Sequence, residues 1–187
     1  MTSLNHIFTK YSVNNSECSV YYYTFDSPLG DITAVADDSY LYMVCFEDSK
    51  NNESTIKSIS KKLSCSFVEE KNEVLIKFEE ELAAYLDGKL KKFTVPLKMI
   101  GTDFQKDVWK KLLKMPYGST QTYGDLAKSL GRSASSSRAI GAACGANPHL
   151  LVVPCHRLVA SNAKGGGFSS GVDRKEWLLN HEKKNNS

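Results

Sequence analysis

The sequence predicts an α/β protein of two domains, and three observations lead to this prediction. Short strand-like segments separated by tight turns occupy the first half, whereas helical spacing of apolar residues dominates from Gly101 onward. The 187 residues, 41% of them hydrophobic, allow one domain or two small ones equally. Residues 1–100 carry 11 Lys and Arg against 15 Asp and Glu, whereas residues 101–187 carry 13 against 6. We expect an N-terminal α/β scaffold domain at 1–98 and a C-terminal domain at 99–187.

Composition excludes several classes of protein. The ordinary apolar content, without a persistent heptad or glycine repeat, excludes disorder, collagen and coiled coil. No segment approaches the roughly 20 apolar residues of a membrane helix, and the first residues lack the basic-then-apolar order of a secretion signal. Five cysteines, an odd number without a Cys-x-x-Cys pair, argue against a disulfide framework. We therefore expect an intracellular protein.

Three strand-like segments open the first half. Residues 20–25 are rich in residues that suit a pleated surface. Residues 31–36 follow after the turn Ser27–Gly30, and residues 40–46 follow after a second turn. Short strands joined by tight turns predict an antiparallel meander.

The remainder of the first half alternates between helix and strand. Residues 51–63 fit a weak helix, residues 65–68 a short strand, and residues 73–86 a firmer helix that ends at Gly88. Residues 93–97 then run extended into the second half.

The second half is predominantly helical. Thr102 or Asp103 is a suitable N-cap for a helix over 104–113, which has an apolar stripe. Two short helices follow, over 122–131 and 135–145. Two helices joined by a tight turn are the layout of a helix-turn-helix, which places one helix in a DNA groove.

The second of these short helices is made largely of Ala and Gly. Such residues allow either close packing against another helix or a close approach of the backbone to DNA. Arg138, a lone cation near the start of the helix, and the net charge of +7 over residues 101–187 favour DNA. Charge alone more often indicates a solvated face.

The most informative segment is Pro154-Cys155-His156-Arg157, which follows the apolar residues 150–153. Pro154 interrupts the extended chain, so Cys155 and His156 come at a bend. A neighbouring imidazole or guanidinium can lower the pKa of a thiol from about 8.5. Cys155 and His156 are therefore a candidate nucleophile and base. A buried structural Cys beside a hydrogen-bonded His is the alternative.

The Cys155-His156 dipeptide lies in one of six sequence blocks. Together these blocks resemble the O6-alkylguanine-DNA alkyltransferase family. The blocks are Gly101-Thr102-x-Phe104, Thr122–Ala127, Ser137–Gly141, Gly145-x-Asn147-Pro148, Pro154–Arg157 and Lys175–Glu182. The resemblance implies an RNase H-like N-terminal domain with a small antiparallel sheet plus helices. For the C-terminal domain it implies helices with a helix-turn-helix.

The resemblance also implies a reaction. Cys155 would accept an alkyl group from O6 of guanine in DNA, and also from O4 of thymine. His156 would act through a water to hold Cys155 as a thiolate, Glu182 would orient His156, and Asn147 would brace the loop. The thioether product cannot be hydrolysed, so each molecule would act once, and no cofactor is needed because the protein is itself the acceptor.

The expected partner is duplex DNA that contains O6-alkylguanine, bound by a monomer through the minor groove. The resemblance implies that the target nucleotide is flipped out, that Arg138 fills its place in the stack, and that Tyr123 meets the rotated phosphate. A minor groove only about 6 Å wide suits a helix with small side chains. Further DNA contacts are expected from Gly124, Gln105, Arg132 and Ser161.

The expected base pocket departs from the family pattern. Phe168 stands where the family commonly has Tyr or Trp, so the base loses a possible hydrogen bond to a hydroxyl. Ser169, Val159 and Tyr123 complete the expected pocket. Ser170 replaces a residue that is often Gly, which could narrow the entrance to bulky adducts.

Metal and competing functions complete the expectations. The spacing of the cysteines and histidines is wrong for a closed zinc site, so we expect no metal. A helix-turn-helix protein that binds damaged DNA without reacting is one alternative. A cysteine hydrolase that uses Cys155 and His156 is another. We expect the nucleus, or the cytoplasm of a prokaryote, as the location.

Overall fold

The computed structural model describes residues 4–161 and 167–186. Contacts divide the chain into two compact units, residues 1–100 and 101–187, each with its own core. Within the described residues, no helix combines the length and the apolar character needed to cross a bilayer.

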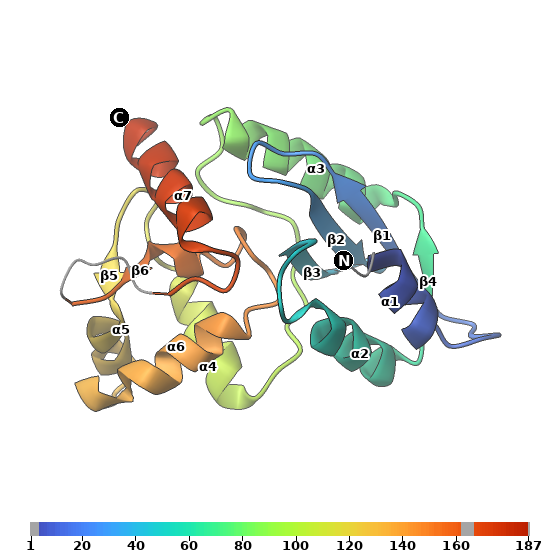
Figure 1. The fold of residues 1–187 in the computed structure, drawn as a ribbon, viewed down its shortest axis with the longest axis horizontal. Coiled ribbons are helices and arrows are strands. Elements are labelled where there is room, and N and C mark those ends of the chain that lie inside the picture. Colours follow the sequence, from blue (N-terminus) through green and yellow to red (C-terminus); the bar gives the residue numbers. More distant parts are fainter. Residues whose placement is uncertain (1–3, 162–166, 187) are drawn as a thin grey trace. The chain divides into compact units, whose positions relative to one another are not determined.

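The N-terminal unit packs helices against a small sheet (Figure 1). In chain order its described elements are α1 (Leu4–Tyr11), β1 (Ser19–Phe25), β2 (Ile32–Ala36), β3 (Leu41–Phe46), α2 (Asn52–Leu63), β4 (Ser66–Glu69) and α3 (Glu73–Leu86). The strands lie in the order β3-β2-β1-β4. The predicted meander is present, because β1, β2 and β3 pair antiparallel. β4 pairs parallel with β1, so the sheet is mixed.

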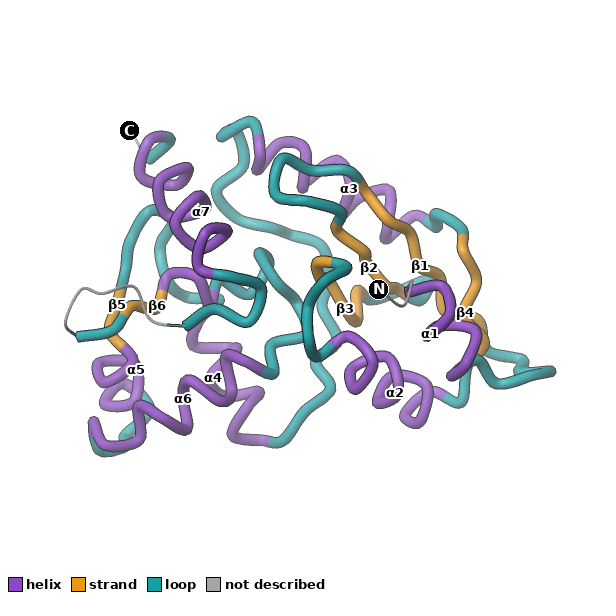
Figure 2. Tube along the Cα trace, viewed as in Figure 1, coloured by secondary structure: helices purple, strands orange, loops and turns teal. Residues whose placement is uncertain are grey.

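Helices cover both faces of this sheet, as the tube in Figure 2 shows. Phe78 of α3 meets Phe25, with 5.8 Å between ring centroids, and Phe8 of α1 stacks on Tyr22 at 3.9 Å. Tyr22 and Phe25 are an odd number of residues apart in one strand, so they face opposite sides. Coverage on both sides explains why every residue of β2 and β3 is buried. α1 was not predicted, because eight residues are too few for a clear apolar stripe.

The C-terminal unit is mainly helical. Its described elements are α4 (Asp103–Leu112), β5 (Gln121–Thr122), α5 (Tyr123–Ser129), the 3-10 turn η1 (Ala134–Ser136), α6 (Ser137–Gly145), the 3-10 turn η2 (Cys155–Arg157), β6 (Leu158–Val159) and α7 (Val172–Lys184). Helices α5 and α6 pack together as the predicted helix-turn-helix. The turn between them starts at Gly131, whose φ of +70° is in the left-handed region that favours glycine.

Helix α4 anchors α6. The N-terminus of α4 is a capping box, in which Thr102 Oγ1 accepts from Gln105 N at 3.2 Å and Gln105 Oε1 accepts from Thr102 N at 2.9 Å. The indole Nε1 of Trp109 donates to the carbonyl of Ala143 at 2.8 Å. A Cβ at Gly101 would lie 2.6 Å from the Trp109 ring, so this close approach requires glycine. These contacts fix the helix that carries Arg138.

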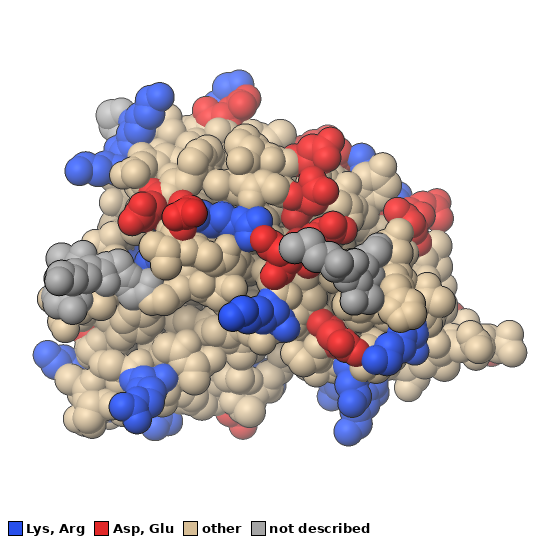
Figure 3. All heavy atoms as spheres, viewed as in Figure 1, with Lys and Arg blue, Asp and Glu red and all other residues tan. Residues whose placement is uncertain are grey.

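Charge is distributed unevenly over the surface. On the face drawn in Figure 3, most acidic side chains lie over the N-terminal unit, while separate Lys and Arg side chains project from the C-terminal unit. This agrees with the net charges of the two halves in the sequence.

Candidate active site

Cys155 begins a single 3-10 turn that follows the buried segment 150–153. The turn is held by hydrogen bonds from Cys155 N to Val153 O at 2.8 Å and from Arg157 N to Pro154 O at 3.1 Å. In a strand, successive side chains would point to opposite faces. The turn removes this restriction and leaves the Cys155 thiol only 3% exposed.

Asn147 ties the loop to the thiol. Its side-chain Nδ2 donates to Cys155 Sγ at 3.2 Å and to Val153 O at 2.9 Å, while its Oδ1 accepts from His149 N at 2.9 Å. Asn147 lies two residues beyond the end of α6 and is buried. One amide therefore links the slim helix, the loop and the thiol.

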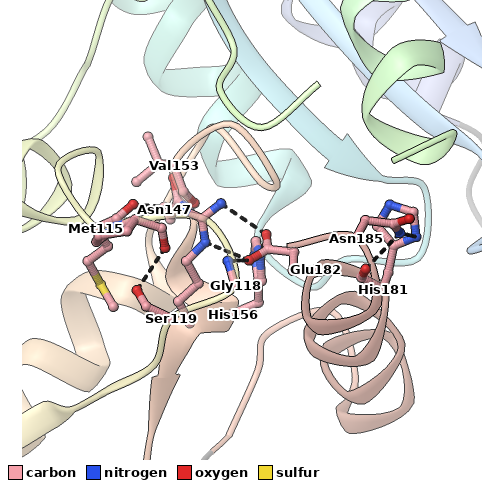
Figure 4. Close-up of polar contacts among 11 residues, drawn as sticks. Met115, Gly118, Ser119, Asn147, Val153, His156, His181, Glu182 and Asn185 are labelled. Atoms are coloured by element: carbon pink, nitrogen blue, oxygen red, sulfur yellow. Dashed lines mark hydrogen bonds and ion pairs between the residues drawn. The ribbon is translucent and has the colours of Figure 1, made fainter. Parts of the chain in front are cut away.

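His156 and Arg157 converge on the carboxylate of Glu182 in α7. His156 Nε2 lies 2.7 Å from Glu182 Oε1, and Arg157 donates through Nε to Oε2 at 2.9 Å and through Nη2 to Oε1 at 3.0 Å. Figure 4 shows Glu182 reaching from α7 toward His156. All three side chains are almost fully buried. The fork geometry of the arginine fixes the carboxylate in one orientation.

Backbone contacts from the segment after α4 complete this network. Gly118 N donates to Glu182 Oε2 at 3.0 Å, and Arg157 Nη1 donates to Met115 O at 2.7 Å. Arg157 also lies 5.7 Å from the ring centre of Tyr117. The carboxylate therefore joins α7, the 3-10 turn η2 and the segment after α4.

Burial and pairing set the protonation states of this network. Burial would raise the pKa of Glu182, but hydrogen bonds and charge from His156 and Arg157 hold that pKa well below its usual range. Burial lowers the pKa of His156, and this outweighs the opposing effect of Glu182. A neutral imidazole donates its Nε2 proton to Glu182 and leaves Nδ1 as an acceptor. Among the described residues, Nδ1 has no hydrogen-bond partner.

The thiol of Cys155 favours its protonated form in this environment. Burial raises the pKa of Cys155, and the Asn147 hydrogen bond and the charge of Lys175 offset the rise only in part. No hydrogen bond joins the side chains of Cys155 and His156 among the described residues. The resting pair is therefore a thiol and a neutral imidazole, and the thiolate must form during the reaction.

A cavity of about 1060 Å³ opens above the thiol, between α5, α6 and the residues after β6. Arg138 lies on its rim, and the small residues Gly141 and Gly145 of the same helix line its wall. The other predicted residues along the wall are Tyr123, Gly124, Cys155, Ser161, Phe168 and Ser169. The structure thus brings the expected nucleophile, three of the four expected pocket residues and the helix-turn-helix to one cavity.

Four predicted residues lie elsewhere. Gln105 serves in the cap of α4, and the guanidinium of Arg132 stacks on Phe104 at 4.5 Å. Val159 pairs with Thr122 in the small β5–β6 sheet, and the described lining does not include it. Ser170 is buried and is also absent from this lining.

The phenol of Tyr123 faces the cavity. Its hydroxyl donates to Gly167 O at 3.2 Å, and burial raises its pKa to about 12. The phenol therefore keeps its proton at neutral pH. Tyr123 can donate a proton or hydrogen bond to a bound base.

Sequence reasoning missed two groups near the thiol. Lys175 is 1% exposed, donates through Nζ to Leu158 O at 2.5 Å, and has a pKa lowered by burial. Cys144 shares the cavity wall with Cys155, and burial raises its pKa. Lys175, Leu178 and Glu182 form the buried face of α7 at helical spacing. Lys175 and Glu182 share one helix face with Leu178, and this helical spacing is the sequence signal that could have predicted the burial of Lys175.

Comparison with known proteins gives matches over both units. Residues 103–184 match the 6-O-methylguanine DNA methyltransferase, DNA binding domain, and residues 20–99 match its ribonuclease-like domain. A methylated-DNA--protein-cysteine methyltransferase of Methanosarcina acetivorans is 41% identical over 165 residues, covering 87% of this chain and 98% of the relative. The inducible enzyme of Bacillus subtilis is 42% identical over 127 residues, or 68% and 70% of the two chains.

Solved structures agree. The crystal structure of Mycobacterium tuberculosis OGT in complex with DNA superposes with a TM-score of 0.76 at 34% identity, covering 88% of this chain and 94% of that one. The O6-methylguanine-DNA methyltransferase of Pyrococcus kodakaraensis gives 0.61 at 26% identity, covering 87% and 98%.

A ribonuclease-like unit joined to a helix-turn-helix unit with a thiol in its cavity defines a DNA-binding protein with a reactive cysteine. The chain belongs to the family of methylated-DNA--protein-cysteine methyltransferases.

Proposed function

We propose that this protein repairs alkylated DNA by direct reversal, moving the alkyl group from the base to its own Cys155. The observation that carries the proposal is that the Cys155 thiol lines the cavity beside the helix-turn-helix, while the next residue, His156, is hydrogen-bonded to Glu182. A nucleophile, a base and an orienting carboxylate are the groups that such a displacement requires.

The transfer follows from the protonation states of the site. A water between Cys155 Sγ and the acceptor Nδ1 of His156 takes the thiol proton and passes one to the imidazole. The thiolate then attacks the alkyl carbon in line, a C–S bond forms, and the C–O bond to the base breaks. The departing base takes the electron pair and a proton, which we assign to the phenol of Tyr123. Solvent then returns a proton to the phenolate and takes one from the imidazolium. Glu182 stabilises the imidazolium while the charge exists.

The chemistry of the product explains why each protein molecule acts once and why the reaction needs no cofactor. A thioether has no hydrolytic exit, so Cys155 stays alkylated and the molecule is consumed. No electron carrier or group carrier enters, because the sulfur itself is the acceptor.

We propose that DNA enters by its minor groove. The α6 wall of the cavity is made of Gly141, Cys144 and Gly145, which leave room for a duplex, and Arg138 stands exposed at the rim. An alkylated base cannot reach a buried thiol from within the stack, so the nucleotide is flipped, at a cost of a few kcal/mol. Arg138 fills the gap left in the stack.

O6-alkylguanine is the proposed substrate, with O4-alkylthymine as a second one. Phe168 supplies an aromatic wall, and Ser169 supplies backbone and hydroxyl donors for the base. We further propose that the protein acts as a monomer in the compartment that holds the DNA, the nucleus or the prokaryotic cytoplasm.

The test is the stoichiometry of repair of a duplex with one O6-methylguanine. The expected result is one alkyl group removed per molecule of protein, with no further turnover. Cys155→Ala should lose repair and keep DNA binding. Continued turnover would point to a hydrolase, and DNA binding without repair by the native chain would point to a damage-recognition protein.

The role of Arg138 has its own test. Arg138→Ala should slow repair of base-paired O6-methylguanine far more than repair of the same base in a single strand, because only the duplex requires stack filling. Lys110→Ala, which removes an exposed cation of α4 away from the cavity, is the matched control and should slow neither reaction. Equal losses on both substrates would overturn the assigned role.

A further inference from the structure

Two cysteines of the N-terminal unit come directly before two paired strands. Cys18 precedes β1 and Cys65 precedes β4. These strands are parallel, with Ser19 opposite Ser66. The hydrogen bond from Ser66 N to Cys18 O at 3.0 Å continues the ladder to the preceding residue. The register therefore sets Cys18 opposite Cys65.

Side chains at paired positions of these strands lie close together. The hydroxyls of Ser19 and Ser66 are 3.4 Å apart. Neighbouring strands lie about 4.8 Å apart, and disulfides join residues whose Cα atoms are roughly 4.4 to 6.8 Å apart. Cys18 and Cys65 therefore lie within the range that a disulfide spans. Burial raises the pKa of Cys65 to about 11, and the neighbouring Cys18 thiol adds to the rise.

The two thiols differ in access. Of the five cysteines, Cys18 is exposed, while the other four are buried. Cys65 is completely buried, and its carbonyl accepts from Val13 N at 3.0 Å, which holds the segment before β1 against the start of β4. A reagent in solution therefore meets Cys18 first, and Cys65 is the nearest thiol to it across the sheet.

We propose that Cys18 and Cys65 form a thiol modification site that reacts with low-molecular-weight disulfides of the glutathione class. The Cys18 thiolate attacks one sulfur of the reagent, an S–S bond breaks as a new one forms, and the first small thiol leaves with the proton that Cys18 gave up. The Cys65 thiol then loses its proton and attacks the Cys18 sulfur, which expels the second small thiol. Two cysteines are oxidised to one disulfide, and one reagent disulfide is reduced to two thiols.

This site is separate from the reactive cysteine. Cys155 belongs to the other unit, is buried, and has a raised pKa, so it reacts more slowly with the same reagent. The cross-link ties the segment before β1 to the segment before β4 and restricts the unfolded chain, which raises the Tm of the oxidised protein.

The experiment treats the full chain with oxidised glutathione, blocks the remaining thiols with iodoacetamide, and maps tryptic peptides without reductant. The expected product is peptide 11–50 joined to peptide 63–71. Because Cys45 shares peptide 11–50 with Cys18, fragment ions assign the bond. Tm is measured before and after oxidation.

Matched variants separate the two steps. Cys65→Ser should retain a glutathione adduct on Cys18 with no cross-link and no rise in Tm, and Cys65→Ala serves where serine disrupts the buried position. Cys18→Ser should show neither adduct nor cross-link. A native chain that keeps the adduct on Cys18 without a cross-link, that joins Cys18 to another cysteine, or that leaves Cys18 unmodified would overturn the proposal.

Discussion

The two units bury different kinds of polar side chain. Apart from tyrosines and cysteines, the described residues of the N-terminal unit include only three buried polar side chains, the neutral Thr33, Asn52 and Ser60. The C-terminal unit buries groups that can carry charge, namely His149, His156, Arg157, Lys175 and Glu182, together with Asn147 and Ser170.

This difference separates a scaffold from a reactive centre. Removing charge from water is costly even when the charges pair, and buried ion pairs often give no more stability than apolar residues of similar size. Stability therefore gives little reason to bury Glu182 and Arg157. The hydrogen bonds of Glu182 to His156 and to Arg157 make sense as a device that holds a neutral imidazole in one orientation next to the reactive cysteine.

The largest expected effect comes from Glu182→Gln. The amide removes the charge that faces Arg157 and His156, so it leaves an uncompensated buried guanidinium, at a cost of about 3 kcal/mol or more of unfolding free energy. Loss of the orienting carboxylate should also lower the transfer rate at least about a hundredfold. Urea unfolding and single-turnover repair measure the two effects.

Glu176→Gln is the control on the same helix, at an exposed position. It should change neither quantity appreciably. If Glu182→Gln unfolded with native free energy, the carboxylate network would not be the organising feature of the unit.

Two asparagines allow a direct comparison between the units. Asn52 donates through Nδ2 to Phe46 O at 2.8 Å, and Asn147 donates to Val153 O and to Cys155 Sγ. Each change to alanine leaves buried backbone groups unsatisfied and should cost about 1–3 kcal/mol in stability. Only Asn147→Ala should also slow transfer, by about tenfold, equivalent to roughly 1.4 kcal/mol. Equal rates for the two variants would show that Asn147 acts only in folding.

Cys144→Leu tests the cavity wall. The larger side chain at this position reduces the space beside Cys155. Overpacking typically costs about 1–3 kcal/mol, and a loss of about 1.4 kcal/mol weakens the binding of a bulky alkyl group tenfold. Repair of a duplex with O6-benzylguanine should fall about tenfold relative to repair of O6-methylguanine. Cys144→Ser should keep the native ratio. An unchanged ratio in the leucine variant would place the alkyl group elsewhere.

The smallest effect is the dependence on pH. Because burial lowers the pKa of His156, the imidazole stays neutral below its ordinary value of 6.5, so the transfer rate should hold to that pH and decline only beneath it. For both His156 and Glu182 the pKa in the folded protein is lower than in the unfolded chain. Their contribution to stability is therefore present at neutral pH and is lost on acidification. His156 contributes first, below 6.5, and Glu182 follows below its ordinary 4.5. A transfer rate that already falls while the pH is lowered from 8 toward about 7 would contradict a neutral imidazole.

Much of the fold was predictable because its signals are local. The strands of the meander follow from residues that suit a pleated surface and from the turns between them, and the helix over 73–86 is marked by its end at Gly88. Thr102 was one of two predicted caps for α4. The parallel pairing of β4 with β1 was not predictable in this way. It joins segments far apart in the sequence, and α1, which packs against β4, is itself too short for a clear apolar stripe.

The site shows the same division. Cys155 and His156 were recognisable as a dipeptide after a proline, and the helix-turn-helix as two short helices. Without the family resemblance, Glu182 would have been taken for a solvated residue, because a charged side chain near the end of a polar helix gives no local sign of burial. Lys175 and Cys144 were missed because burial beside the thiol is a property of the folded unit.

The most direct test of the account is the mass of one peptide after reaction with O6-methylguanine DNA. Trypsin cleavage after Arg138 and Arg157 releases residues 139–157, which contain both Cys144 and Cys155. Transfer of the alkyl group to Cys155 predicts one added methyl group, which fragment ions should assign to Cys155. A methyl group on Cys144, or an unmodified peptide after the DNA has been repaired, would contradict it.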